Sequence, residues 1–254
     1  MCLVIFAHQV SQEFPLVVAA NRDEFHARPT APSRFWEDQP QLLAGRDLQG
    51  GGTWMGVTRD GRFAAVTNYR DPSRTGPAPR SRGELPLHYL TGTESPAGYL
   101  ENLATKAGDY AGFNLLLGDS QGLWYLSNSK GEPQRLAPGI YGLSNAALDT
   151  PWPKVTLGKN RLEQLLQRQS ISHEKLAATV ADRALADSRA LRIQGLDSSM
   201  DEVLSAQFIV TETYGTRSCT TLWIDSGQQV SWQEQTFDGQ GTAGSVTVEN
   251  FEKT

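Results

Sequence analysis

Two groups of strand-like segments enclose one helical block, and this order constrains the fold of the chain more than any other feature. Thr53–Thr58 and Phe63–Tyr69 flank Asp60-Gly61, a dipeptide that favours the tight turn of a β-hairpin. From Pro153 to about Ala186, apolar residues recur at the i, i+3, i+4 spacing of an amphipathic helix. Strand-type patterns then return at Gln207–Glu212, Cys219–Asp225 and Gln229–Thr236. The order predicts an α+β protein with layered antiparallel sheets rather than alternating βαβ units.

The remaining short patterns fit the same layered plan. The apolar runs Leu3–Ala7 and Leu16–Ala20 predict a pair of antiparallel strands. Ser95-Pro96 predicts the start of a helix, with the serine as N-cap and the proline at the first helical position. Further predictions are strands at Phe113–Gly118, Leu123–Ser127 and Ile140–Ser144, a short helix at Met200–Ala206, and a long ordered loop at Asn21–Gly52.

Composition limits the classes of protein to which the chain can belong. Its 254 residues are 39% hydrophobic and 20% charged with no repeat or linker, which predicts one globular domain over residues 1–254. The net charge of −5 argues against general nucleic-acid binding. No apolar run approaches the ~18 residues of a membrane-spanning helix, and the first residues do not resemble a secretory signal. We therefore expect a cytoplasmic protein with reduced cysteines and no integral membrane segment.

Cys2 directly follows the first methionine, and this position gives it a particular chemistry. Methionine aminopeptidases generally remove a methionine that precedes a small residue, which leaves the cysteine with both a thiol and a free α-amine. The amine has an ordinary pKa of ~7.7–8.0, so it can accept the proton of its own thiol near neutral pH. This is the pattern of an N-terminal nucleophile. The simpler alternative is a buried cysteine at the start of an edge strand.

Four consecutive hydrogen-bonding residues, Asn21, Arg22, Asp23 and Glu24, follow directly after the apolar run Leu16–Ala20. So many polar side chains at the end of a strand cannot all belong to the core. Arg22 is a candidate to hold a cysteine thiolate by its charge, and Asp23 to orient the α-amine. Asn21 or Glu24 would then brace the loop. The alternative is a surface loop of ion pairs.

Three further polar residues lie near predicted strand ends. Asn68 and Asn145 each follow a strand pattern, where a side-chain amide can donate to an oxyanion. The commoner role of asparagine in such a place is to cap a turn. Arg217 in YGTRSCT is predicted on a glycine turn between two strands and is a candidate second cation. Its alternative role is that of a solvated loop arginine.

Other ligand-binding motifs are weak. The glycine-rich sequence GRDLQGGGTWMG, residues 45–56, does not open a helical pattern, so it does not predict a phosphate-binding loop. A tight turn that places Trp54 near a pocket is the better interpretation. The four histidines lack the paired spacing of metal ligands and there is no CxxC motif, so no metal site is predicted; they are His8, His26, His88 and His173.

Several motifs taken together resemble those of the transport and Golgi organisation protein 2 family, also called the NRDE family. In chain order they are MC, NRDEF, LAGRDLQGGGTWMG, RFAAVTNYR, SRGEL, GFNLLLGD, YGLSNAALDTPWPKV and YGTRS, between Met1 and about Leu222. This family is similar to the N-terminal nucleophile hydrolases that use cysteine, such as choloylglycine hydrolase and penicillin V acylase. The resemblance implies a four-layer αββα sandwich of two antiparallel sheets.

The resemblance also implies roles for individual residues. One position departs from the pattern: Cys219 stands where Ser or Thr is expected, which should affect packing more than mechanism. The implied matches are Cys2 with the nucleophile, Arg22 and Asp23 with its supporting Arg and Asp, Asn145 with the oxyanion Asn, Arg217 with the arginine of a late loop and, more loosely, Asn68.

Two functions from different classes fit the sequence. In the first, Cys2 hydrolyses a small, partly apolar amide or thioester without a cofactor, as a hydrolase of non-peptide C–N bonds. In the second, the same cleft carries haem or an acyl lipid, because the family is associated with haem trafficking and with lipid or acyl-CoA homeostasis. A haem ligand would come from Cys2, Cys219 or a His, Tyr or Met that the sequence does not single out. The expected partner is in both cases a small molecule, and the sequence predicts neither its identity nor the oligomeric state.

Overall fold

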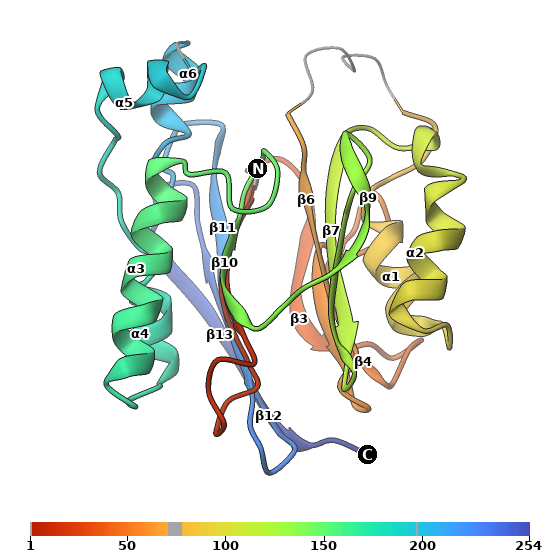
Figure 1. Cartoon of the computed structure of the whole chain (residues 1–254). Helices are drawn as coiled ribbons and strands as arrows, with labels where there is room; N and C mark the ends of the chain where they lie inside the picture. Colours follow the sequence, from red (N-terminus) through yellow and green to blue (C-terminus); the bar gives the residue numbers. More distant parts are fainter. Residues whose placement is uncertain (1, 71–77, 197) are drawn as a thin grey trace.

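Two antiparallel sheets lie face to face between two layers of helices (Figure 1). The computed structural model describes residues 2–70, 78–196 and 198–254. The six-stranded sheet contains, in spatial order, β10 (Gly139–Leu143), β1 (Cys2–His8), β2 (Leu16–Phe25), β11 (Tyr214–Ile224), β12 (Gln229–Phe237) and β13 (Ala243–Glu252). The seven-stranded sheet contains β3 (Thr30–Phe35), β4 (Leu42–Asp47), β5 (Met55–Thr58), β6 (Phe63–Asn68), β7 (Phe113–Asp119), β8 (Gly122–Ser127) and β9 (Lys130–Arg135).

Helices cover the outer face of each sheet (Figure 1). The seven-stranded sheet packs against α1 (Glu84–Thr91) and α2 (Pro96–Ala104). The six-stranded sheet packs against α3 (Pro153–Gln167) and α4 (His173–Ala178). The shorter elements are a 3-10 turn at Ala107–Asp109, α5 (Ser188–Ile193) and α6 (Ser199–Val203). Within the described residues, no helix has the length and apolar character needed to cross a membrane.

Burial of β1 on both faces explains its continuous apolar sequence. Successive side chains of a strand point to opposite faces of its sheet. Val4 and Phe6 pack into the core between the two sheets, whereas Leu3 and Ile5 pack into the core beneath α3 and α4. All seven residues of β1 are therefore buried. A third core joins the seven-stranded sheet to α1 and α2.

Several local predictions are confirmed. β5 and β6 pair across Asp60-Gly61, where Gly61 has a φ of 83°, a conformation that favours glycine. β1 pairs with β2 over its whole length, and β7 pairs with β8. α2 begins at Pro96, and the Ser95 hydroxyl accepts a hydrogen bond from the Gly98 N–H at 3.2 Å. The antiparallel α+β arrangement as a whole is also confirmed.

The prediction of a long loop over Asn21–Gly52 is wrong. β2 continues to Phe25, and the same segment adds β3 and β4. β3 is an edge strand, where the missing N–H of Pro32 is tolerated, and its register with β4 shifts between Ala31 and Arg34. The polar end of β2 stays in the sheet because its side chains have partners in the folded chain.

The C-terminal half needs three further corrections. The helical block ends at Ala178 and is divided into α3 and α4. Gln207–Glu212 is not a strand; its Phe208 N–H donates to the Asp182 carbonyl, outside any sheet. β11 begins at Tyr214, so Arg217 lies in a strand and not on a glycine turn.

Besides β3 and β4, sequence reasoning missed α1, α5, β9 and β13. The residue that precedes α1 is Gly83, whose backbone is helical and which offers no capping side chain, so the usual start signal is missing. α5 has only six residues, too few for a periodic apolar pattern. The two strands lie at sheet edges and expose most of their residues, so neither presents the buried apolar face by which a strand is usually identified from sequence.

Candidate functional site

A cavity of about 740 Å³ lies between the two sheets, at the end where β1 begins and β2 ends. Its wall combines residues of β1, β2, β11 and β12 with residues of β3, β4 and β6 from the other sheet. Trp54 and the segment 78–83, which leads into α1, complete it, so the expectation that Trp54 lies near a pocket is confirmed. The predicted site residues that line the cavity are Cys2, Arg22, Asp23, Glu24, Asn68 and Arg217.

Cys2 and Arg22 lie directly opposite one another in the pairing of β1 with β2. Such partners project from the same face of the sheet, with Cβ atoms ~4.5–5.5 Å apart. The face is the one between the sheets, because the next pair on that face, Val4 and Ala20, belongs to the core between them. Arg22 is 6% exposed, and its Nη1 donates to Thr30 Oγ1 at 3.2 Å. The guanidinium is therefore held on the same face as the thiol.

Asp23 lies beside the start of β1, because it follows the residue that pairs with Cys2. It is buried, and its Oδ1 accepts a hydrogen bond from Thr216 Oγ1 at 2.7 Å. The Tyr214 hydroxyl donates to the Asp23 carbonyl oxygen at 2.9 Å. Burial raises the pKa of the Asp23 carboxyl, while the charge of Lys154 opposes this shift. The Asp23 carboxyl group is thus held in place at the end of β2, next to the start of β1.

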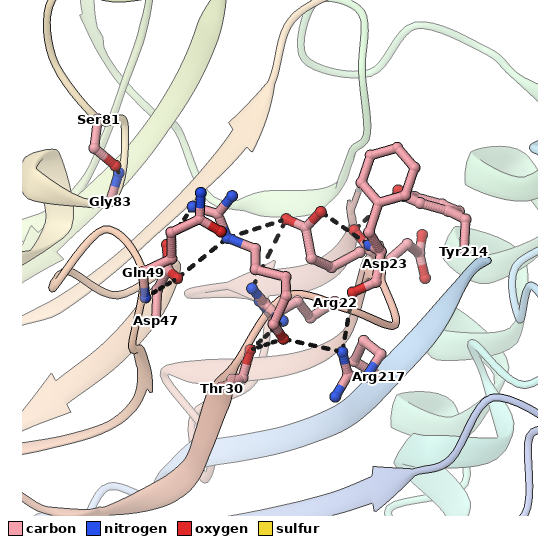
Figure 2. A network of polar contacts seen from close by, with 12 residues as sticks. Arg22, Asp23, Thr30, Asp47, Gln49, Ser81, Gly83, Tyr214 and Arg217 are labelled. Carbon is pink, nitrogen blue, oxygen red and sulfur yellow. Dashed lines mark hydrogen bonds and ion pairs between the residues drawn. The ribbon is translucent and has the colours of Figure 1, made fainter.

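Ion pairs continue from Arg22 along the wall of the cavity (Figure 2). Glu24 Oε2 lies 3.8 Å from Arg22 Nη2 and 3.9 Å from Arg28 Nε. Arg28 in turn donates to both carboxylate oxygens of Asp47, at 3.1 Å from Nε and 2.6 Å from Nη2. A two-bond pair of this kind restricts the orientation of both groups. The chain of contacts therefore joins the polar end of β2 to β4.

Arg217 occupies a β-bulge. Thr216 pairs with Asp23 and Ser218 with Arg22, so Arg217 is the extra residue between two consecutive pairs. A bulge bends the strand and redirects the side chain at that point. The Arg217 Nη1 donates to three backbone carbonyls of residues 25, 26 and 28, at 3.0, 3.1 and 3.3 Å (Figure 2). The arginine therefore supports the turn between β2 and β3 at the edge of the cavity.

The two predicted oxyanion donors occupy different places. Asn68 ends β6 and lines the cavity, whereas Asn145 is not among the described residues of its wall. Asn145 is 1% exposed, and its Nδ2 donates to the Asn68 carbonyl oxygen at 2.8 Å. Its Oδ1 accepts a hydrogen bond from Ser144 Oγ at 3.1 Å. Asn145 thus holds the end of β6 from behind the wall, and an oxyanion role for either residue stays a prediction.

Asn21 is fully buried, and its side chain connects β2 by hydrogen bonds to two segments that are not part of the sheet. Its Nδ2 donates to the carbonyl oxygens of Val180 at 2.7 Å and Gln207 at 2.8 Å. These partners lie toward the helical layer, on the face opposite to that of Arg22. Of the four NRDE residues in the described chain, Asn21 is the one that does not line the cavity.

The thiols and carboxyls of the chain do not form a metal centre in the part that the structure describes. No group of three or more His, Cys, Asp or Glu residues is placed there to hold a metal ion.

Cys2 and Cys219 are both free and buried. Burial raises the pKa of the Cys2 thiol, and the guanidinium of Arg22 acts against that rise. Burial raises the pKa of Cys219 to about 12.

Comparison with known proteins decides the family. The sequence profile described as Transport and Golgi organisation 2 matches residues 1–239. The chain belongs to the Transport and Golgi organisation 2 family. The Mus musculus homologue is 33% identical over 96% of this chain and 95% of its own length. The Bos taurus homologue is 34% identical over 99% of both chains, and the Homo sapiens homologue is 34% identical over 93% of both.

The fold extends beyond the Transport and Golgi organisation 2 family. A variant of conjugated bile acid hydrolase from Clostridium perfringens aligns with 100% of this chain and 98% of its own, with a TM-score of 0.50. Its sequence is 9% identical, so the similarity concerns the fold alone. Together with the two helix-covered antiparallel sheets, it confirms the predicted sandwich of the N-terminal nucleophile hydrolase type.

Two cations of this member of the Transport and Golgi organisation 2 family were missed by sequence reasoning. Lys154, near the start of α3, is 3% exposed and donates from Nζ to the Leu204 carbonyl at 2.8 Å. Burial lowers the pKa of Lys154, while the charges of Asp23 and Cys2 oppose this. Arg82 lines the cavity directly. Both residues belong to motifs that carried the family resemblance, PWPKV and SRGEL, and this was the available signal.

Proposed function

We propose that this protein is an amidohydrolase that uses Cys2 as an N-terminal nucleophile on a small, partly apolar amide or thioester. The supporting observation is the pair formed by Cys2 and Arg22 at the wall of the cavity, with Asp23 beside the start of β1. A nucleophile of this type needs a thiol, an α-amine as base and a cleft for the scissile carbonyl. Met1 must be removed for this chemistry, because only then does Cys2 carry the free amine. The proposed setting is the cytoplasm, where thiols stay reduced.

In the first half of the proposed reaction, the α-amine of Cys2 takes the thiol proton and Sγ attacks the carbonyl carbon. The electron pair of the C=O bond moves to the oxygen, toward which Asn68 is the proposed donor. Collapse of this intermediate breaks the C–N bond of an amide or the C–S bond of a thioester. The α-ammonium then returns the proton to the leaving group. Arg22 stabilises the thiolate, and the Asp23 carboxylate accepts a hydrogen bond from the ammonium.

The second half of the reaction releases the acyl group as an acid. A water molecule gives a proton to the α-amine and adds to the thioester of Cys2. The C–S bond then breaks, and the sulfur recovers the proton. No cofactor takes part in either half. The Lys154 ammonium favours the ionised form of Asp23, which the proposed hydrogen bond to the Cys2 ammonium requires.

Retention of the first methionine is the most direct test. We compare the processed protein, with Cys2 at its N-terminus, with a form that carries an uncleaved N-terminal extension. The substrates are octanoyl p-nitroanilide and S-octanoyl-N-acetylcysteamine, and turnover is followed by absorbance. Loss of the α-amine should lower the rate by ~10²–10⁴-fold, the usual contribution of a general acid–base group. Mass spectrometry establishes which N-terminus each sample has.

Two controls separate catalysis from folding. Cys2→Ser should keep the circular dichroism spectrum and melting temperature of the parent but react far more slowly, since a hydroxyl ionises much less than a thiol. The extended form should also keep the parent melting temperature. Equal turnover by the extended and processed forms would rule out the N-terminal nucleophile mechanism.

The second candidate is a carrier that binds haem or an acyl compound in the same cavity. One observation favours it: burial raises the pKa of the Cys2 thiol, which lowers the thiolate fraction available for attack. Cys2 is also the one residue of the described cavity wall that belongs to the common types of haem ligand, His, Cys, Met and Tyr. Titration with haemin should then give a saturable absorption shift that Cys2→Ala abolishes. Saturable binding that is the same in the parent and in Cys2→Ala would exclude ligation by this thiol.

A further inference from the structure

The charge of the cavity differs from that of the whole chain. The protein has a net charge of −5, yet arginines outnumber carboxyl groups among the described residues of the cavity wall. The arginines are Arg22, Arg28, Arg46, Arg80, Arg82 and Arg217, against the carboxyl groups of Asp23, Glu24, Asp47, Glu234 and Asp238. An anion can bind in such a wall only at an arginine that no carboxylate already neutralises.

Half of these arginines are hydrogen-bonded to carboxylates and are not available to a ligand. The pairs are Arg28 with Asp47 at 2.6 Å, Arg46 with Asp38 at 2.9 Å and Arg80 with Glu84 at 2.8 Å. Of the others, Arg217 is bonded to three backbone carbonyls through Nη1, and Arg22 lies 3.8 Å from Glu24. Arg82 remains.

Arg82 has no carboxylate within 4.0 Å among the residues that the structure describes. Its Nη1 donates to the Gly112 carbonyl oxygen at 3.2 Å, which leaves most of its five N–H groups for other partners. Burial lowers the pKa of Arg82, while the charges of Cys2 and Glu24 act in the opposite direction. The guanidinium is therefore partly desolvated, and it lines the same cavity as the candidate nucleophile.

A half-buried guanidinium without a counter-charge is unfavourable, because it has lost hydration that no ion pair replaces. A ligand anion bound against Arg82 would restore that interaction. The side chains of Trp54, Val66 and Phe237 supply apolar surface to the same wall. The lining as a whole thus suits a ligand with one compact anionic group and an apolar body.

We propose that the cavity binds amphipathic anions and that Arg82 is the residue that holds their carboxylate or phosphate group. This inference rests on the proposed function in one respect, that ligands bind in the cavity beside Cys2. It does not depend on hydrolysis. In this proposal, Arg82 makes the cavity bind a charged ligand more tightly than a neutral ligand that has the same apolar body.

The test is isothermal titration of the full-length protein with three probes that share one alkyl chain: octanoate, octyl phosphate and 1-octanol. The parent should bind one or both anions more tightly than the alcohol. The anion that binds more tightly shows whether the site prefers a carboxylate or a phosphate. Arg82→Gln should weaken anion binding by ~10–100-fold, the loss expected for charged hydrogen bonds. Its affinity for 1-octanol should change less than twofold. Arg82→Lys, which keeps the charge, should retain part of the preference.

Arg62→Gln is the matched control. Arg62 also has no carboxylate within 4.0 Å in the described chain and donates to two backbone carbonyls, those of Tyr89 and Glu94, but it lies outside the cavity. Its replacement should leave all three affinities unchanged. Equal loss of octanol and anion binding in Arg82→Gln would show that the arginine only supports the wall. Anions that bind the parent no better than 1-octanol, or none of the probes binding, would also overturn the inference.

Failure of the proposed function gives a different result. If the processed protein hydrolyses neither octanoyl substrate, but Arg82→Gln selectively loses the anions, the anion site stands and the hydrolase proposal falls. If the protein hydrolyses the substrates but does not prefer the anions, the hydrolase proposal stands and the anion site falls.

Discussion

Asn68 and Asn145 are joined by one hydrogen bond, yet their surroundings predict different effects of mutation. Asn68 lines the cavity, so Asn68→Ala should lower kcat of the proposed hydrolysis by ~10²-fold, as removal of an oxyanion donor does. Asn145 satisfies buried groups behind the wall, so Asn145→Ala should lower the free energy of unfolding by ~1–3 kcal/mol. Urea unfolding and steady-state kinetics on both variants measure the two effects.

The reverse pattern would reassign the oxyanion site. If Asn145→Ala loses kcat and keeps its stability, the side-chain amide of Asn145 reaches the substrate after rearrangement of the wall. Asn21→Ala serves as a reference for a purely structural loss, because Asn21 donates to two buried carbonyls on the far face of β2.

At the scale of single elements, α4 is attached to the six-stranded sheet through His173. Its Nδ1 lies 2.7 Å from Thr221 Oγ1 of β11, and its Nε2 lies 3.0 Å from Ser231 Oγ of β12. The ring also lies against Trp223, with ring centroids 4.3 Å apart. Burial lowers the pKa of His173 to about 4. The imidazole is therefore neutral in the folded protein at pH values where a free histidine gains a proton.

This contact predicts that the protein loses stability in mild acid. An unfolded histidine titrates near pH ~6.5, so between there and pH 4 the unfolded state binds more protons than the folded state. The contribution of His173 to the free energy of unfolding is fully present above this window. It declines as the pH falls through the window, by on the order of 2 kcal/mol. For a chain of this length that corresponds to a fall of ~4–8 °C in Tm. Melting curves at pH 7.5 and pH 4.5 measure it.

His173→Gln should reduce this pH dependence, whatever its effect on stability at neutral pH. His88 is exposed on α1 and gives the control, since His88→Gln should melt with the pH dependence of the parent. An unchanged difference in Tm between the two pH values in His173→Gln would show that other groups cause the acid sensitivity.

At the scale of the whole molecule, the cavity exists because the ends of two sheets form one wall. The segment after β10 crosses from the six-stranded sheet to the other: Ser144 Oγ donates to the Cys2 carbonyl, and Asn114 Nδ2 of β7 donates to the Ala146 carbonyl at 2.9 Å. On the opposite side, Trp232 Nε1 of β12 donates to Ser33 Oγ of β3 at 3.0 Å. These cross-sheet bonds fix the distance between Cys2 and the residues that face it.

The sequence by itself determined many of the local elements and singled out several residues of the candidate site. Apolar runs marked β1 and β2, Asp60-Gly61 marked a hairpin, and the Ser95 cap marked α2, because each signal acts over a few residues. Cys2 and the NRDE residues were also visible, since four polar residues after an apolar run are unusual whatever their partners are.

Only the tertiary structure decided how those residues divide their roles. The bulge that directs Arg217 depends on pairing with β2, almost 200 residues earlier in the chain, and no local pattern encodes such a register. Asn145 lies behind the wall, whereas Arg82 lies in the wall and is not paired with a carboxylate among the described residues, because of how the two sheets meet. Burial and charge pairing are properties of the packed chain, so they set the pKa shifts and the character of the cavity only after distant segments come together.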